Sequence, residues 1–123
     1  MRRLVSLRIV GHKQTFTASS AWIARGFLER LGGLLVHPRL VERETLVIER
    51  CNCVHTFFMK YPIDVVFCSA QNTVVRIIRD LKPFRMSAMV RNASYVIELH
   101  ASTALDGVNE GDHIEIEHSD SRI

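Results

Sequence analysis

The sequence predicts a mainly β fold, a compact β-sandwich or barrel with one α-helix in its N-terminal half. Three observations predict it. Short runs rich in Val, Ile, Phe and Thr recur along the chain, turn-forming residues separate them, and one segment alone shows helical spacing of its apolar residues. Many short strands with a single helix are typical of sandwiches and barrels.

The N-terminal part predicts two strands and then the helix. Residues 4–10 alternate apolar and polar side chains, which predicts a strand, and residues 15–17 form a second short one. Either serine of the pair 19–20 can cap the start of the helix, and the glycine pair 32–33 can end it after about three turns. The apolar residues at helical spacing are Ala24, Phe27, Leu28 and Leu31.

After residue 38 every predicted element is a strand. The run 74–78 is apolar on both faces, which predicts a central strand, whereas the last run alternates isoleucine with charged residues and exposes one face to water. In the turn at 69–72, Asn72 is the residue best suited to a positive φ. The predicted strands are Thr45–Ile48, His55–Lys60, Ile63–Cys68, Thr73–Arg79, Tyr95–Leu99 and His113–Glu117.

Length and composition indicate one globular domain over residues 1–123. With 47% hydrophobic and 24% charged residues, the chain is neither disordered nor fibrous. A domain of this size can bury a core without a disulfide or a metal as a staple. No membrane span and no signal peptide are indicated, and three cysteines fit reduced thiols better than a disulfide framework. We therefore expect a cytoplasmic protein.

The charge indicates no dedicated polyanion or membrane partner. The formal net charge is +3, and the basic residues are dispersed along the chain with acidic residues between them. No run resembles a nucleic-acid tail or a polybasic membrane patch. We expect no membrane partner, and a nucleic-acid-binding module is the least favoured function.

The stretch CNCVHTFFMK, residues 51–60, is the strongest candidate for special chemistry. If it is extended, alternate residues share one face, and thiolate, imidazole and thioether are ligands that zinc or copper favours. Same-face neighbours on a strand lie roughly 6.5 Å apart, so a straight strand cannot supply three ligands to one ion. A bend or a residue such as His37, His100 or Asp64 would have to complete the set. The candidate metal ligands are Cys53, His55, Cys51 and Cys68.

A core strand with buried sulfur explains the same stretch without a metal. Cysteine is among the most buried residue types, and methionine fills gaps in cores. The same spacing argues against a thiol nucleophile, because Cys51 or Cys53 would need His55 within hydrogen-bond reach. We therefore expect no cofactor, with zinc or copper as the alternative.

The stretch is also part of a set of ordered motifs. Residues 54–67, VHTFFMKYPIDVVF, combine an aromatic residue, Met, a basic residue, a short turn, a Pro-Ile-Asp triplet and an apolar strand. The other motifs are Arg30-Leu-Gly-Gly33-Leu34-Leu35, Leu81-x-Pro83-Phe84-Arg85, Ala93 to Leu99, and Gly107-Val108-x-x-Gly111-Asp112. Together they resemble the uncharacterised bacterial and archaeal family named domain of unknown function 192, most strongly over residues 30–117. The resemblance implies a small jelly-roll-like β-sandwich with a helix near its start, and no established activity.

Five residues are candidates for a ligand pocket: Arg30, His55, Met59, Asp64 and Glu98. Asp64 enters an apolar strand and needs a partner, for which the planar fork of Arg30 is suited; alternatively Asp64 caps a turn and Arg30 is a helix C-terminal cation. His55 titrates near neutrality. Glu98 is either a solvent-facing residue of an alternating strand or a second carboxylate near Asp64.

These observations favour a small non-enzymatic binding or accessory module. It would bind a small polar or anionic ligand, or a protein partner, in a polar pocket. The alternative is a zinc or copper protein, or a metal-dependent enzyme that uses the cysteines and histidine of CNCVH. The sequence identifies no catalytic residue.

Overall fold

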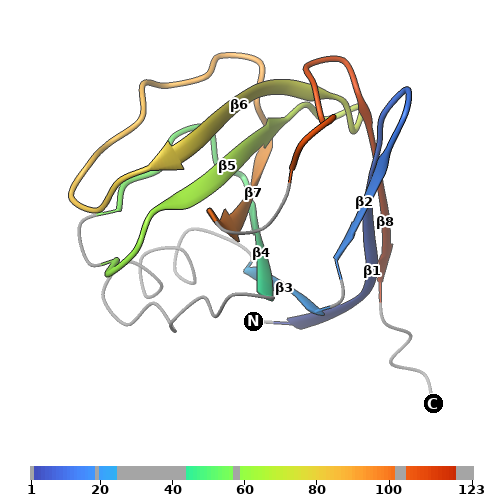
Figure 1. Ribbon diagram of the computed structural model, residues 1–123, viewed down its shortest axis with the longest axis horizontal. Coiled ribbons are helices and arrows are strands. Elements are labelled where there is room, and N and C mark those ends of the chain that lie inside the picture. The colour runs from blue at the N-terminus through green and yellow to red at the C-terminus, as the bar shows by residue number, and fades with distance from the viewer. Residues whose placement is uncertain (1, 19, 25–43, 57–58, 102–104, 119–123) are drawn as a thin grey trace.

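The computed structural model describes residues 2–18, 20–24, 44–56, 59–101 and 105–118. Within these ranges the chain forms eight β-strands and no helix (Figure 1). The strands are β1 (Arg2–Val10), β2 (Thr15–Ala18), β3 (Ser20–Ala24), β4 (Glu44–Glu49), β5 (Ile63–Cys68), β6 (Val74–Leu81), β7 (Tyr95–His100) and β8 (His113–His118). None of the described residues belongs to a helix that could cross a lipid bilayer.

The predicted mixture of strands with one N-terminal helix is wrong, because the described part of the chain is all-β. The residues expected to start the helix form β3, which pairs antiparallel with β1 and parallel with β4. Ala21 and Ile23 are buried while Trp22 packs against a different cluster, so this segment alternates between two faces as a strand does. Pairing on both sides therefore makes this segment a strand. The rest of the expected helix, Phe27 to Leu31, lies outside the described residues, and the jelly-roll arrangement stays a prediction.

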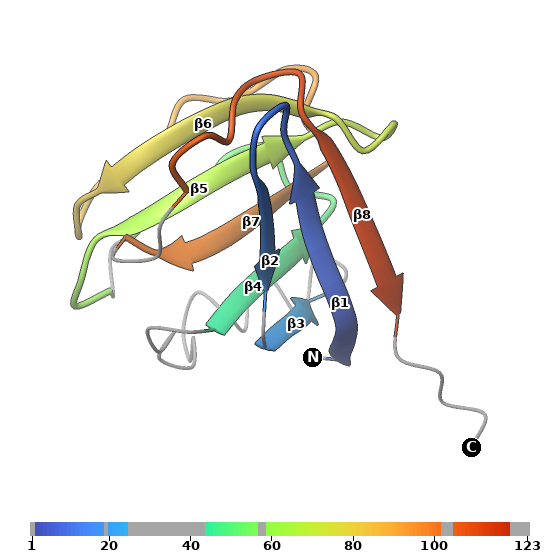
Figure 2. The ribbon, with the colours of Figure 1, turned by 45° about the vertical axis from the view of Figure 1, so that its right-hand side comes forward.

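The strands form one continuous sheet in the order β2-β1-β3-β4-β7-β5-β6, with β8 on the other edge of β1. The long strand β1 pairs through Arg2–Leu4 with β3 and through Leu7–Val10 with β2. Its pairing with β8 shifts register between Leu4 and Ser6. The sheet bends there, so that β1, β2 and β8 form one limb that crosses the limb of β4, β7, β5 and β6 (Figures 1 and 2).

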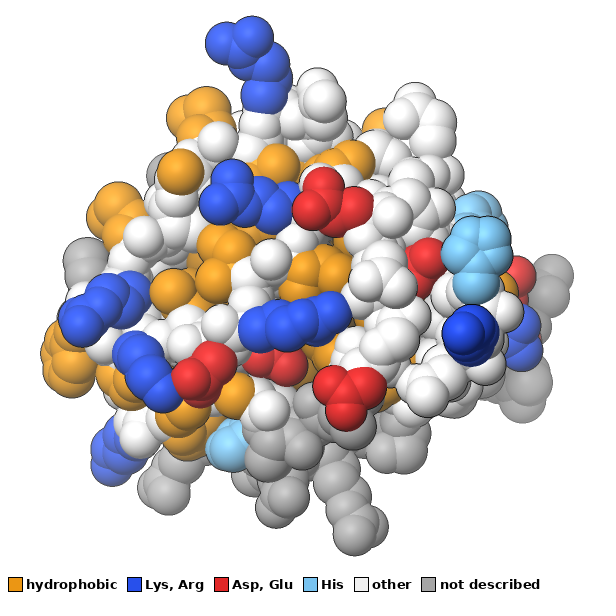
Figure 3. Space-filling view, turned by 45° about the horizontal axis from the view of Figure 1, so that its top comes forward, with side chains coloured by type: hydrophobic (Ala, Val, Ile, Leu, Met, Phe, Trp, Pro, Cys, Tyr) orange, Lys and Arg blue, Asp and Glu red, His pale blue; other side chains and the backbone are white. Residues whose placement is uncertain are grey.

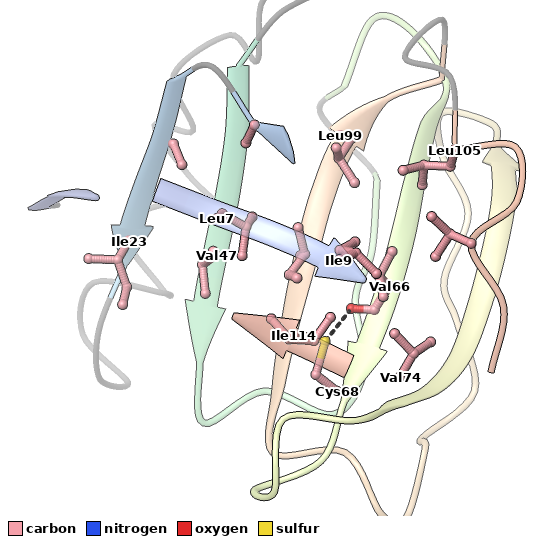
Figure 4. Close-up of a cluster of buried hydrophobic side chains, with 14 residues drawn as sticks. Leu7, Ile9, Ile23, Val47, Val66, Cys68, Val74, Leu99, Leu105 and Ile114 are labelled. Atoms are coloured by element: carbon pink, nitrogen blue, oxygen red, sulfur yellow. Dashed lines mark hydrogen bonds between the residues drawn. The ribbon is translucent and has the colours of Figure 1, made fainter. Parts of the chain in front are cut away.

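The main core, which we call the inner cluster, lies between these two limbs (Figure 4). Both limbs contribute apolar side chains, and segment 105–108 adds two more. Its central members are fully or almost fully buried: Leu7, Ile9, Val47, Val66, Cys68, Val74, Ile97, Leu99 and Ile114. Because the opposite side chains of β4, β5 and β7 are also apolar, this limb needs a second cover on its other face.

That second core, the outer cluster, is formed by the opposite face of β4, β5 and β7 and by loop residues. Its strand residues include Leu46, Val65, Phe67 and Val96. Cys51 and Val54 are buried with them, and side chains from segments 59–61 and 90–93 pack against them. Two loops that are remote in sequence therefore cover the outer face of the sheet.

Two strand predictions are wrong and one turn prediction is confirmed. The run 74–78 belongs to β6, which ends the strand order instead of lying at its centre, although its side chains reach both clusters. Of the predicted strand 55–60, only His55 makes an isolated bridge, to Met86, and residues 57–58 lie outside the described residues. Asn72 has φ of 62°, as expected for its turn.

Candidate binding site

Two loops lie side by side over the outer face, and we call residues 51–56 and 82–91 the paired loops. They run antiparallel and are held by backbone hydrogen bonds. The N–H of Ser87 donates to the carbonyl of Val54 at 2.8 Å, and the N–H of Val54 donates to the Ser87 hydroxyl at 2.9 Å. Further along, the N–H of Val90 donates to the Asn52 carbonyl at 2.8 Å. The second loop is thereby held in place without belonging to a regular strand.

The second loop carries an exposed apolar ridge, which consists of Phe84, Met86 and Met89. Their exposed fractions are 67%, 65% and 71%. Among the described residues, these three are the large hydrophobic side chains that are exposed. In Figure 3, hydrophobic side chains reach the surface between side chains of Lys and Arg. Large apolar side chains gathered on one surface segment mark interaction sites more often than isolated ones do.

Phe84 is also in an unfavourable backbone conformation, with φ of 62°. For a bulky residue the left-handed region costs roughly 1–2 kcal/mol, and such outliers gather at functional sites. The N–H of Phe84 donates to the carbonyl of Thr56 at 2.9 Å, which holds the turn in this shape. The ring is therefore presented to solvent at a conformational cost that its own burial does not offset.

His55 and Met59 lie on or beside the paired loops, as candidates for the pocket. His55 is half-buried and bridges to Met86 of the ridge. Met59 is half-buried and packs against the outer cluster. Arg30 lies outside the described residues.

Glu98 lies on the outer face of β7, where it is only 4% exposed. Its neighbours across the sheet are Leu46 on β4 and Val65 on β5, both of the outer cluster. The account of Glu98 as a solvent-facing strand residue is therefore wrong. On the same face of β7, the His100 ring stacks on Tyr61, with ring centroids 4.5 Å apart.

Asp64 points to the other face of the sheet. Asp64 lies two and four residues before Val66 and Cys68, so it shares the face of these inner-cluster residues. It therefore does not share a face with Glu98. The carboxylate Oδ1 accepts a hydrogen bond from the N–H of Asp80 at 2.8 Å. The two predicted carboxylates are therefore not brought together in one pocket.

Asp64 accepts a hydrogen bond at a β-bulge of the neighbouring strand β6. Asp80 has φ of 57°, and the pairing of β5 with β6 shifts register between Ile63 and Val65, which makes a bulge opposite Asp64. Burial raises the pKa of Asp64, against the opposing effects of the Asp80 N–H and of the Arg79 charge. Its hydrogen bond holds the bulge of β6, which differs from the predicted cap of a turn.

The three thiols lie in different places in the structure. Cys51 is buried and its thiol donates to the carbonyl of Cys53 at 3.0 Å, while Cys53 is exposed. Cys68 is fully buried in the inner cluster, across the sheet from Cys51, and burial raises its pKa to about 12. The described residues hold no group of three or more His, Cys, Asp or Glu side chains suited to a metal ion. Among the described residues, Cys51, Cys53 and His55 therefore belong to no such group.

Residues 8–116 match the sequence pattern of the family described as "Uncharacterized ACR", DUF192. The chain belongs to this family. DUF192 is a family of unknown function, so membership assigns neither an activity nor a site to this chain. The matched residues include all the motifs on which the resemblance was based.

Solved structures show that the DUF192 chain shares its fold with other proteins. A protein of unknown function from Novosphingobium aromaticivorans has a TM-score of 0.76 at 19% identity, over 91% of this chain and 84% of the other. A Sinorhizobium meliloti protein described as a "putative transcription regulator" has a TM-score of 0.73 at 22% identity, over 90% of this chain and 92% of the other. No curated protein matches this chain. At these identities the likeness concerns the fold alone.

Sequence reasoning on this DUF192 chain missed the apolar ridge as a site. The signal was present in Leu81-x-Pro83-Phe84-Arg85, where an aromatic residue follows proline in a turn outside any predicted strand. Met86 and Met89 follow within a segment that has neither helical nor strand periodicity. Apolar residues that lie next to turn residues and follow neither a helical nor a strand periodicity indicate a segment whose side chains do not pack in the core.

Proposed function

We propose that this chain is a non-enzymatic binding module that docks a protein partner on the paired loops. The observation that carries the proposal is the exposure of Phe84, Met86 and Met89 on one short, hydrogen-bonded segment. Aromatic residues, Met and Arg are enriched at protein interfaces, and Arg85 lies within the ridge segment while Arg91 follows it. The expected partner therefore buries the three apolar side chains and contacts the arginines around them.

The hydrogen bonds of the paired loops support this proposal energetically. Ordering a loop on binding costs conformational entropy, and a loop that is already ordered avoids much of that cost. The second loop is bonded to the first through Val54, Thr56 and Asn52. A partner would thus meet a surface whose backbone is already in position.

The proposal moves the candidate site away from the pocket expected around Arg30 and Asp64. His55 and Met59 remain beside it, whereas Asp64 lies on the opposite face of the sheet and holds a bulge. We also place the module in the bacterial cytoplasm. The three cysteines are free thiols, which supports a reducing compartment.

Site-specific photo-crosslinking tests the proposal. A benzoylphenylalanine crosslinker replaces Phe84 or Met89 in cells of the source organism, and a control places it at His12, an exposed residue of the β1–β2 turn. We expect a discrete crosslinked protein at the ridge positions that is absent at His12. The partner is then identified and purified, and its binding is measured by calorimetry.

The calorimetry uses ridge variants of the purified module. Because apolar anchors dominate interface energies, Met86→Ser with Met89→Ser is expected to weaken binding by a factor of roughly 30 or more. Identical crosslinks at the ridge and at His12, or unchanged affinity in the double variant, would overturn the proposal.

A further inference from the structure

We infer that the partner contacts the paired loops with an acidic segment, an inference that rests on the proposed function. Residues 50–62 contain Arg50 and Lys60, residues 81–97 contain Lys82, Arg85 and Arg91, and neither segment contains Asp or Glu. These segments hold five positive charges, while the whole chain has a formal net charge of +3. The rest of the chain therefore has a net charge of −2. Of the five cations, Lys82, Arg85 and Arg91 belong to the paired loops, and all three are exposed.

The tertiary structure brings the paired loops together. In the sequence Asp64 and Asp80 lie between them. Hydrogen bonds place residues 51–56, which contain no acidic residue, beside the loop that carries Lys82, Arg85 and Arg91. Lys82 pairs with Asp80 at 2.6 Å, which partly neutralises its charge. Arg85 and Arg91 are both exposed, on either side of Met86 and Met89 in sequence.

The charge argues against a second copy of this chain as the occupant. A symmetric dimer joins the same surface of each subunit, which would set these cations against one another. Like charges facing each other across an interface cost several kcal/mol. An acidic segment has the opposite effect, since it gains attraction to the cations while its apolar residues cover the ridge.

The composition favours a protein segment over a lipid surface. Interfacial membrane anchors combine Trp, Phe or Leu with cations, whereas protein interfaces are enriched in Met and Arg and depleted in Lys. The ridge contains two methionines and one phenylalanine, and two of the three cations in the paired loops are arginines. An acidic segment with apolar anchors therefore matches both the charge and the composition.

The test uses a random copolymer of glutamate and tyrosine as the acidic, apolar probe. Polyglutamate and equimolar phosphatidylglycerol–phosphatidylcholine vesicles are compared with it. The variants are Arg91→Glu, Met89→Ser and Lys13→Glu, the last an exposed residue of the β1–β2 turn with the same change in charge as Arg91→Glu. Dissociation constants are measured by titration at low and at high salt.

We expect the copolymer to bind the unmodified protein more tightly than polyglutamate does. Binding should weaken about tenfold in Arg91→Glu and in Met89→Ser, change little in Lys13→Glu, and weaken with salt. Three results would overturn the inference: no binding of the copolymer, equal losses in Arg91→Glu and Lys13→Glu, or tighter binding to the vesicles than to the copolymer.

The crosslinked partner separates failure of this inference from failure of the proposed function. If that partner binds through Met86 and Met89 but is insensitive to salt and to Arg91→Glu, the docking surface stands and its acidic partner chemistry is wrong. If the Met86 and Met89 variants bind the partner as the unmodified protein does, the docking surface itself is wrong.

Discussion

Thr56 and Arg85 exchange two hydrogen bonds across the paired loops. The N–H of Thr56 donates to the Arg85 carbonyl at 2.8 Å, and the N–H of Arg85 donates to the Thr56 hydroxyl at 2.9 Å. The same hydroxyl donates to the carbonyl of Lys82 at 2.6 Å. Since Thr56 is fully buried, it binds the turn around Phe84 to the covered face of the sheet.

We expect Thr56→Val to destabilise the protein by about 1–3 kcal/mol. Valine keeps the shape but leaves the part-buried N–H of Arg85 and carbonyl of Lys82 without this partner, and a polar group left unsatisfied away from water costs about that much. Urea unfolding measures the change. Thr17→Val on β2, where the side chain is exposed, is the control and should stay within about 0.5 kcal/mol of the unmodified protein. Equal stabilities of the two variants would contradict the role of Thr56.

Phe84→Gly is expected to abolish partner docking without loss of stability. Glycine adopts a positive φ without the steric cost that Phe84 bears, although it loses more entropy on folding. The free energy of unfolding should stay level or rise by up to about 1 kcal/mol. Phe84→Ala removes the ring but keeps the strain, so it should be less stable than the glycine variant. A clear loss of stability in Phe84→Gly would show that the ring serves folding.

The pH dependence of stability is expected to report the raised pKa of Asp64. The folded protein holds the Asp64 proton to higher pH than the unfolded chain does. In the unfolded chain the pKa of this carboxyl is near 3.8. The resulting stabilisation is present below that value and is lost as the pH rises through the folded pKa. It amounts to about 1.4 kcal/mol per unit by which folding raises the pKa.

Asp64→Asn isolates this effect, because asparagine keeps an oxygen for the Asp80 N–H and does not titrate. Urea unfolding of both proteins between about pH 3 and pH 7 gives the difference in stability. The unmodified protein should lose stability relative to the variant as the pH rises. A relative gain would mean that the Asp80 N–H and Arg79 outweigh burial and that folding lowers the pKa.

Thiol labelling of the native protein is expected to show one fast cysteine. Cys53 is exposed, whereas Cys51 and Cys68 are 3% and 0% exposed. Burial also raises the pKa of Cys68 to about 12, so its reactive thiolate is scarce at neutral pH. The two buried thiols should react only as fast as the protein opens. In Cys53→Ser the fast phase should vanish. A fast-reacting thiol that remains in this variant would show that the outer cluster is open at Cys51.

Native mass spectrometry is expected to show a metal-free protein. The protein is purified under reducing conditions without a metal-affinity tag, beside its His55→Ala variant. Within CNCVH the Cys51 thiol donates to a carbonyl, and the further candidate ligand Cys68 lies across the sheet from it. A stoichiometric zinc or copper ion that is lost in the variant would contradict this prediction and restore the metal site.

Local pattern predicted most strands well, because alternation reports which side chains face a core. Ile63–Cys68 was predicted with its observed bounds, and His113–Glu117 exposes one face of β8 as expected. It failed where tertiary pairing decides the conformation. Ser20–Ala24 is a strand because β1 and β4 pair with it on either side. The strand β6 ends the strand order, and it has apolar side chains on both faces because these side chains pack into the two clusters.

The candidate pocket residues were chosen for the chemistry of their side chains, and the structure does not bring all of them together. His55, Met59, Asp64 and Glu98 were singled out, yet Asp64 and Glu98 lie on opposite faces of the sheet. The parity of a residue within its strand follows from the sequence, but the face that each parity presents depends on how neighbouring strands align. The sequence contains no direct information on that alignment.

By itself the sequence determined the family, the strands with clear alternation, and the turn at Asn72, because motifs, period and turn chemistry are local properties. Only the tertiary structure decided that β3 is a strand, that the buried carboxylates are apart, and that residues 51–56 lie beside the loop that carries Phe84, Met86 and Met89. Each of these depends on contacts between segments remote in the chain. Such contacts are decided by which surfaces bury one another when the sheet bends, and no single segment specifies that choice.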